Sequence, residues 1–384
     1  MDFSLSPEQE SLRARMTEFA QSHLNEATKP VTPDNVFDRV LWNKCGREGI
    51  LGMMTEREHS GSEKVDHLTA LIAMEALGYG CTDNGLPFAI NANIWTIQLP
   101  LQELGTEDQK ERFLPRLCSG EWIGCHAMTE PDSGSDAFSM QTRATPCDGG
   151  YRLSGEKCMI SLAPTSDLII LFATVKPEAG RWGVTTFLVP TASEGITVSA
   201  PTAKMGLESV PMGTITFNDC FVPEANRLGP EGAGASIAQH GLEFERCGIF
   251  SSMLGRMARQ LEDCIAYAKS RKQAGRPIGA NQSVSNRIAD MKVRLETTRL
   301  LAYKLAWMLS QGKPATTEAA MLKLVLSEEF LSSGIDAMRI HGGHGYLVDN
   351  GLERDVRDAL GGVLYAGTSD IQRNIIAGML GVHG

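Results

Sequence analysis

Apolar residues recur at helical spacing through the first third of the chain. The stretch begins with Ser6-Pro7-Glu8-Gln9, which combines a capping serine, proline at the first helical position and glutamine three residues after the cap. Leu12, Met16 and Phe19 then fall on one face of the predicted helix. The pattern predicts a mostly helical region over residues 1–118.

Short β-branched runs replace the helical spacing in the middle of the chain. Residues 168–173, 184–189 and 214–217 are apolar, rich in β-branched side chains and bounded by glycine, proline and aspartate. These runs predict strands, so we expect a strand-rich region over residues 119–230.

Helical spacing returns after a glycine-rich stretch at residues 229–234, which we interpret as a connecting loop. The recurring apolar face includes Ile288, Met291, Leu295, Leu301, Leu305 and Met308. We therefore predict a helical bundle over residues 231–384. With no segment repeated at a fixed period, the order helices, strands, helices predicts an α+β fold of three regions.

Composition and charge are those of an ordered globular protein, with 42% hydrophobic and 21% charged residues. The net charge of −10 and the lack of a Lys/Arg run argue against nucleic-acid partners. No window approaches the ~18 consecutive apolar residues of a membrane span, so no membrane association is expected.

Nine cysteines are scattered without a Cys-x-x-Cys pair, and Met1-Asp2-Phe3 does not open a signal peptide. Both observations favour reduced thiols and a cytoplasmic location.

Several chemistries are excluded because their motifs are missing from the sequence. The chain has no phosphate-binding P-loop, no His-Glu-x-x-His and no Gly-x-Ser-x-Gly. His341 and His344 lack cysteine or carboxylate neighbours at metal-site spacing, so no metal is expected. The glycines between these histidines instead allow the backbone to approach a ligand closely.

Residues 126–136 carry two hydroxyls, Thr129 and Ser135, around a proline and a glycine between strand-like flanks. Such a loop can offer hydroxyl and amide donors to an anion or a heterocycle. Most loops of this composition are only turns, so the segment by itself is a weak signal.

Four separated motifs together resemble the acyl-CoA dehydrogenase family. They are Thr129-Glu130-Pro131 with Gly134-Ser135-Asp136, Arg271-Lys272-Gln273 with Gly275-Arg276-Pro277-Ile278, Gly342-Gly343-x-Gly345-Tyr346, and Gly367-Thr368-x-x-Ile371-Gln372. The resemblance implies an N-terminal helical domain, a central β-barrel and a C-terminal four-helix bundle. It also implies a homotetramer with one FAD per subunit.

The resemblance assigns most candidate site residues to the cofactor. Arg271 and Gln282 would reach a flavin held by a neighbouring subunit, and Met159 and Ala274 stand where aromatic residues are usual in the family. The implied FAD-binding set is Met128, Thr129, Ser135, Met159, Ser161, Arg271, Gln282, Arg339, Gly342, Gly343, Thr368 and Asp370.

A catalytic base is missing from its usual place before Gly367-Thr368, because Ala366 cannot accept a proton. Some family members carry the base in a Glu-Arg dipeptide after the β domain, which here matches Glu245-Arg246. Glu243 is the competitor, but it lies ~200° away around a helix. The alternative is that Glu245 and Arg246 are solvated helix charges.

Further roles at the active site follow from the same resemblance. The amide of Ala366 would donate to the substrate carbonyl, and Arg246 and Ser135 would contact substrate. Burial should raise the pKa of Glu245 toward the working pH.

The expected activity is FAD-dependent α,β-dehydrogenation of an acyl thioester, with the hydride passing to flavin N5. Residues 80–86, 209–213 and 284–292 resemble dehydrogenases that oxidise prolyl groups tethered to acyl or peptidyl carrier proteins, toward pyrroline or pyrrole products. Glu208 stands at a position where many members of the family have arginine. The change either suits a different thioester carrier or is a surface substitution.

Other interpretations stay open. The alternatives to a prolyl dehydrogenase are a short- or branched-chain acyl-CoA dehydrogenase acting on a CoA thioester, and a non-catalytic acyl-binding member. The electron acceptor is either an electron-transfer flavoprotein or O2.

Overall fold

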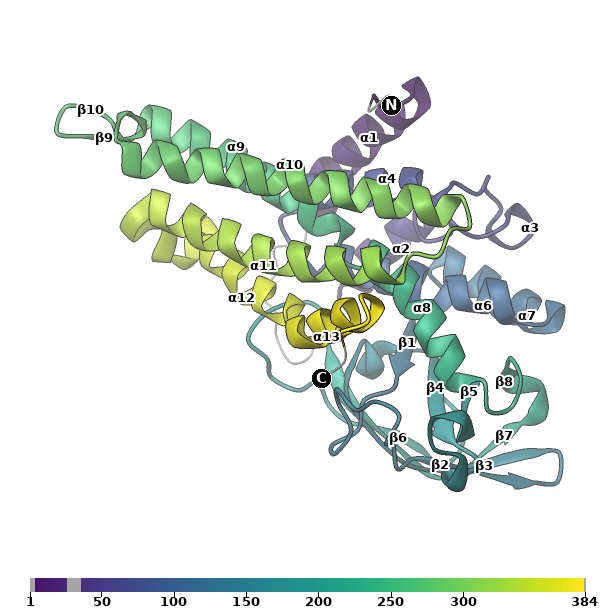
Figure 1. Cartoon of the computed structure of the whole chain (residues 1–384). Coiled ribbons are helices and arrows are strands. Elements are labelled where there is room, and N and C mark those ends of the chain that lie inside the picture. Colours follow the sequence, from purple (N-terminus) through teal and green to yellow (C-terminus); the bar gives the residue numbers. More distant parts are fainter. Residues whose placement is uncertain (1–3, 26–35, 383–384) are drawn as a thin grey trace.

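The computed structural model describes residues 4–25 and 36–382, which form helical, strand-rich and helical parts in that order (Figure 1). The predicted α+β fold is confirmed. The boundaries proposed at residues 118/119 and 230/231 remain predictions, and Met1-Asp2-Phe3 lie outside the described residues.

The first part opens with the predicted capping box. The Ser6 hydroxyl accepts a hydrogen bond from the Gln9 amide at 3.2 Å, and the Gln9 side chain accepts one from the Ser6 amide at 3.0 Å. The helices are α1 (Pro7–Phe19), α2 (Arg39–Arg47), α3 (Arg57–Ser60), α4 (His67–Gly80), α5 (Gly85–Asn91), α6 (Leu99–Leu104) and α7 (Glu107–Ser119), with π-helical segments η1 (Ala20–Leu24) and η2 (Ala92–Gln98).

The middle part is one mixed sheet in the order β6-β7-β3-β2-β4-β5-β8, with β1 paired in parallel to β4. All seven residues of β4 are buried, which explains its unbroken apolar sequence. The strands are β1 (Gly124–Ala127), β2 (Arg143–Cys147), β3 (Gly150–Ser161), β4 (Leu168–Thr174), β5 (Val184–Pro190), β6 (Ile196–Val198), β7 (Met212–Pro223) and β8 (Arg227–Leu228).

The last part is a bundle of long helices that projects away from the sheet, with the β9–β10 hairpin at its far tip (Figure 1). Met291, Leu295 and Leu305 of the predicted apolar face are buried. The elements are α8 (Gly234–Gly248), α9 (Ser251–Ser270), β9 (Lys272–Gln273), β10 (Arg276–Pro277), α10 (Gln282–Ser310), α11 (Thr316–His341), α12 (Leu352–Gly362) and α13 (Ser369–Met379).

Two glycines allow α4 of the first part to cross α9 of the bundle closely. A methyl group on Gly78 would come within 1.9 Å of the Ser252 carbonyl oxygen, and one on Gly255 within 1.8 Å of the Glu75 carbonyl oxygen. Larger residues would push the helices apart. The N-terminal helices and the bundle therefore share one core.

No helix among residues 4–25 and 36–382 is long and apolar enough to cross a membrane. All nine cysteines are free thiols.

Candidate active site

A cavity of about 140 Å³ lies where the three parts of the chain meet. Segment η2 contributes from the first part, β1 and β3 from the sheet, and α8 from the bundle. Five predicted site residues line the cavity together: Met128, Thr129, Met159, Ser161 and Glu245.

Glu245 presents its carboxylate to the cavity from α8. The side chain is half-buried, and no hydrogen bond or ion pair engages it within the described residues. Burial raises its pKa to about 7, against a smaller opposing effect of the neighbouring Arg246 charge. An unengaged carboxylate with a pKa near neutrality is suited to accept a proton from a ligand.

Glu243 is directed elsewhere, because its carboxylate accepts a hydrogen bond from the Thr316 hydroxyl at the start of α11. It does not line the cavity. The two acidic residues of α8 therefore point in different directions, as the helical geometry predicted.

Arg246 contacts the segment before α13. It is only 5% exposed, and its Nε lies 3.5 Å from the Ala366 carbonyl oxygen, to which Gln372 also donates at 3.1 Å. Ala366 adopts a left-handed backbone conformation with φ of 55°. Its own amide has no hydrogen-bond acceptor in the part of the chain described, so the N–H remains available as a donor.

Two hydroxyls on the sheet side of the cavity lack partners. Thr129, just after β1, and Ser161, at the end of β3, are half-buried, and neither side chain is hydrogen-bonded among the residues described. Met159 lies beside them with a left-handed φ of 55° and a side chain that is 61% exposed. This wall offers hydroxyl donors and a polarizable sulfur, which suits a polar heterocycle such as a flavin.

The loop after Thr129 is anchored by a buried ion pair. Lys157 Nζ donates to Glu130 Oε1 at 2.8 Å and to the Met128 carbonyl oxygen at 2.9 Å. Burial alone would raise the pKa of Glu130, but hydrogen bonds from Lys157, Thr142 and Gln141 outweigh it and lower that pKa. The glutamate of the Thr-Glu-Pro motif therefore fixes the backbone next to Thr129.

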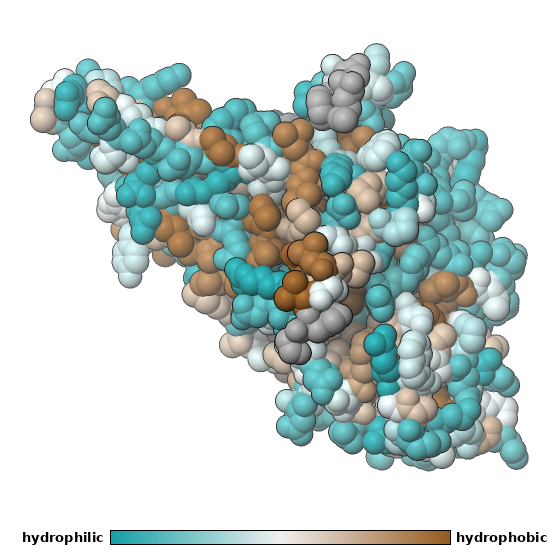
Figure 2. Space-filling model, in the orientation of Figure 1, coloured by the Kyte–Doolittle hydropathy of each residue, from teal (hydrophilic) through white to brown (hydrophobic). Residues whose placement is uncertain are grey.

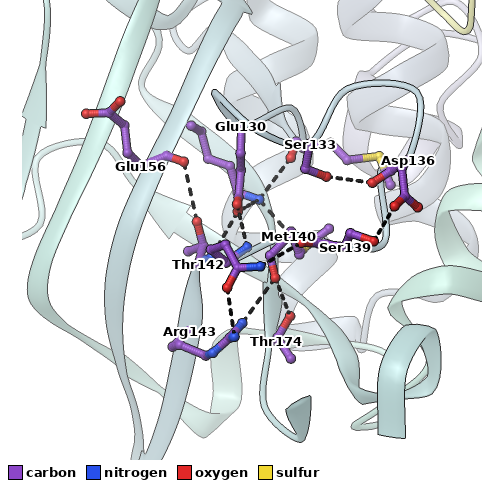
Figure 3. A network of polar contacts seen from close by, with 12 residues as sticks. Glu130, Ser133, Asp136, Ser139, Met140, Thr142, Arg143, Glu156 and Thr174 are labelled. Atoms are coloured by element: carbon purple, nitrogen blue, oxygen red, sulfur yellow. Dashed lines mark hydrogen bonds and ion pairs between the residues drawn. The ribbon is translucent and has the colours of Figure 1, made fainter. Parts of the chain in front are cut away.

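Ser135 lies on the exposed outer part of this loop and does not line the cavity. Around it, the Ser133 hydroxyl donates to the Asp136 carbonyl oxygen at 2.6 Å, and the Ser139 hydroxyl donates to the Asp136 carboxylate (Figure 3). The loop thus shapes its turn with its own polar groups.

A separate group of predicted residues lies toward the far end of the bundle (Figure 1). The end of α9 meets the end of α11 there, where the Tyr267 ring stacks on His341 at 4.1 Å. This group is exposed and is remote from β1 and β3 within one chain. It consists of Arg271, Gln282, Arg339, Gly342 and Gly343.

The two remaining predicted residues lie at the start of α13. The Thr368 hydroxyl caps the helix by accepting from the Ile371 amide at 3.3 Å. Asp370 is exposed and pairs with Arg373 at 3.0 Å.

The cavity-lining residues that sequence reasoning did not assign include the aromatic and polar side chains of Phe88, Thr96, His126 and Tyr365. The Tyr365 ring contacts Phe88 edge-on and stacks on Phe250, both at 5.2 Å, and its hydroxyl is buried without a partner. The available signals were that His126 begins the segment 126–136 and that Tyr365 directly precedes Ala366. Phe88 and Thr96 had none, because they come from a distant helical segment.

Residues 80–86 and 209–213, two of the three segments that resemble prolyl dehydrogenases, contact each other. The Ser209 hydroxyl donates to the Asp83 carboxylate at 2.8 Å. Glu208 pairs with Arg357, which also pairs with Glu353 at 2.7 Å. The charge of Glu208 is thus balanced within the chain, which favours the interpretation as a surface substitution.

Comparison with known proteins agrees with this geometry. Models of the acyl-CoA dehydrogenase N-terminal, middle and C-terminal domains match residues 6–121, 125–220 and 232–381. An L-prolyl-[peptidyl-carrier protein] dehydrogenase of Pseudomonas fluorescens is 46% identical over 337 residues, which make up 88% of each chain.

Solved structures give the same result. The prolyl acyl carrier protein oxidase AnaB has a TM-score of 0.96 and 41% identity, covering 98% of this chain and 100% of its own. PigA, solved with FAD and proline, has a TM-score of 0.96 and 37% identity over the whole of both chains. The predicted similarity to prolyl-carrier dehydrogenases is confirmed, and the chain belongs to the acyl-CoA dehydrogenase family.

Proposed function

We propose that this chain is an FAD-dependent dehydrogenase that introduces an α,β double bond into an L-prolyl group tethered to a carrier protein. The observation that carries the proposal is the half-buried, unengaged carboxylate of Glu245 in a cavity that it shares with the free hydroxyls of Thr129 and Ser161. The Pseudomonas relative and the AnaB structure carry prolyl-carrier substrates in their names, which supports the substrate.

FAD would be held by two sets of residues. Met128, Thr129, Met159 and Ser161 would contact it at the cavity, and Thr368 and Asp370 would lie beside it at the start of α13. When bound, the flavin supplies a hydride acceptor at N5. Ser135 would contribute only from the loop rim, because its side chain is exposed.

The neighbouring subunit would supply a further set of contacts to the same cofactor. These are Arg271, Gln282, Arg339, Gly342 and Gly343, which lie away from the cavity of their own chain. This arrangement supports a homotetramer, because one chain alone does not bring all the predicted cofactor residues together.

Glu245 removes the proton from the α carbon of the thioester. Its raised pKa makes it a stronger base than an exposed glutamate while leaving about half of it ionised near pH 7. The Ala366 amide, which has no other acceptor in the residues described, donates to the thioester carbonyl and stabilises the charge that develops there. Arg246 would act on the substrate through Ala366, since it contacts that residue's carbonyl oxygen.

The proposal extends to the electron acceptor and the cellular location of the enzyme. Electrons would leave to an electron-transfer flavoprotein or to O2. The nine free cysteines support a cytoplasmic location, where thiols stay reduced.

The base is tested with Glu245→Gln, which keeps the shape and removes the proton acceptor. We expect the variant to retain FAD but to lose bleaching of the flavin by prolyl-carrier protein under anaerobic conditions. Glu243→Gln is the matched control and should bleach at nearly the wild-type rate, because Glu243 contacts Thr316 instead of the cavity. Wild-type bleaching by Glu245→Gln would refute the assignment.

The substrate is tested by offering the wild-type protein L-prolyl-carrier protein, butyryl-CoA and isovaleryl-CoA. Bleaching by the prolyl carrier alone is expected. Bleaching by the CoA thioesters would instead support an acyl-CoA dehydrogenase, and purified protein unable to bind flavin would support the non-catalytic alternative.

A further inference from the structure

Three polar side chains form the boundary between the main cavity and a smaller side pocket. Thr96 of η2, His126 of β1 and Glu245 of α8 line both spaces. The side pocket has a volume of about 10 Å³ and is otherwise lined mainly by apolar side chains, including Ile170, Phe172 and Ile237. It can hold about one water molecule and no acyl chain.

Thr96 and His126 are polar groups without partners. Thr96 is 7% exposed, and its hydroxyl is buried without a hydrogen bond. Neither ring nitrogen of His126 has a hydrogen-bond partner within the described chain, and the ring packs against Phe172 at 5.0 Å. An unsatisfied buried polar group is costly, so the buried Thr96 hydroxyl, beside the half-buried His126 ring and one carboxylate, indicates a polar ligand atom at that place.

His126 faces the cavity as a neutral imidazole. Burial and, to a smaller extent, the nearby Lys157 charge together lower its pKa to about 4. At neutral pH one ring nitrogen is therefore a hydrogen-bond acceptor, and the Thr96 hydroxyl oxygen can accept as well.

The chemistry of the reaction fixes which substrate atom can lie there. Glu245 must approach the hydrogen on the α carbon, and in a prolyl group the ring nitrogen is bonded to that same carbon. Groups that flank Glu245 are therefore within reach of this nitrogen. An acyl group without nitrogen would leave Thr96 and His126 unsatisfied.

We propose that His126 and Thr96 accept hydrogen bonds from the ring nitrogen of the prolyl substrate, which carries two N–H donors when protonated, and thereby select it over an acyl group of the same shape. The inference rests on the proposed function and assigns two specificity-determining residues to it. A site that hydrogen-bonds a substrate N–H discriminates against analogues that lack it, because its own polar groups are then left unpaired.

The test compares L-prolyl with cyclopentanecarbonyl, a ring of the same size without nitrogen, on the same carrier protein. The measurement is the anaerobic rate of flavin bleaching for the wild type, His126→Phe, His126→Asn and Thr96→Val. His23→Phe is the matched control, since His23 is exposed on η1 and lines neither space.

The wild type should bleach at least about tenfold faster with the prolyl ring, the equivalent of one hydrogen bond. His126→Phe and Thr96→Val should each lower this preference about tenfold, because the bleaching rate with L-prolyl falls. The bleaching rate with cyclopentanecarbonyl should stay the same or rise. His126→Asn, which retains an acceptor, should recover part of the preference, and His23→Phe should keep all of it.

An unchanged preference in both His126→Phe and Thr96→Val would overturn the inference and show that these groups hold only a water molecule. Equal rates with both substrates in the wild type would overturn it as well, while leaving dehydrogenation intact. If neither substrate bleaches the wild type, the proposed function itself fails. Of these variants, Thr96→Val changes the shape of the side chain least. It therefore decides the outcome if His126→Phe loses its flavin.

Discussion

At the scale of single residues, the position of Glu245 decides its chemistry. The Glu-Arg dipeptide identified the residue, but an adjacent pair of that kind is usually solvated. Burial beside the cavity favours the proposed base over a solvated charge, because it removes the carboxylate from water and raises its pKa.

The raised pKa of Glu245 predicts the pH dependence of flavin bleaching. The base works in its deprotonated form, so the single-turnover rate should increase with pH and level off above an apparent pKa of about 7. An exposed glutamate would give a rate that is already level well below pH 6. Stopped-flow bleaching with prolyl-carrier protein between pH 5.5 and 9 checks this, and a flat profile would contradict the burial argument.

Left-handed backbone conformations at non-glycine residues also gather near the site. Met159 and Leu162 line the cavity, and Ala366 follows the cavity residue Tyr365. Such conformations cost ~1 kcal/mol or more and persist where surrounding contacts hold them. For Ala366 these contacts are the hydrogen bonds that its carbonyl oxygen accepts from Arg246 and Gln372.

At the scale of elements, one buried ion pair ties β3 to the loop that carries Thr129. Lys157 is fully buried, and Glu130 is 4% exposed. The three donors to Glu130 come from Lys157 and the backbone at Gln141 and Thr142, so its carboxylate fixes both ends of the loop.

Lys157→Met should therefore destabilise the protein and loosen the loop that carries Thr129 at the cavity. Removing one partner of a buried pair typically costs ~3–5 kcal/mol, because the other charge stays buried and uncompensated. We expect a lower midpoint of denaturant unfolding and weaker FAD retention. Lys64→Met is the control; its pair with Glu56 is partly exposed and should change stability by less than ~1 kcal/mol.

Lys157→Met combined with Glu130→Gln should recover much of the lost stability, because no buried charge would remain. A double variant no more stable than Lys157→Met alone would contradict the ion-pair account.

At the scale of the whole molecule, exposed apolar side chains indicate surfaces that contact other chains. Val293, Leu300 and Trp307 on α10 lie at intervals of seven residues, and they are 47–61% exposed. Figure 2 shows hydrophobic areas along the face that α10 and α11 occupy and beside the C-terminus. Exposed apolar side chains repeated along one face of an outer helix are typical of an interface between subunits.

Leu300→Glu should weaken the assembly by placing a charge on this face of α10. We expect light scattering after size-exclusion chromatography to give a tetramer for the wild type and a smaller species for the variant. Flavin content should fall with it, if Arg271 and Gln282 serve a neighbouring subunit. Val40→Glu, at an exposed apolar position on α2, is the control and should leave the mass unchanged. A tetrameric Leu300→Glu variant would exclude this face as an essential interface.

The sequence by itself determined the order of helices and strands, the capping box at Ser6, the family and the candidate base. The helices, the strands and the capping box depend on residues close together in the chain, and the helices and strands follow the 3.6-residue and 2-residue periods. Short motifs such as Thr129-Glu130-Pro131 are likewise local, so they can be recognised without a structure.

Only the tertiary structure decided which side chains share the cavity. Thr96, His126, Glu245 and Tyr365 come from four separate segments, and no spacing in the sequence links them. Their meeting depends on close packing, such as the crossing of α4 and α9 at Gly78 and Gly255. The burial that raises the pKa of Glu245 and leaves Thr96 unsatisfied is a property of this packing, and therefore of the fold as a whole.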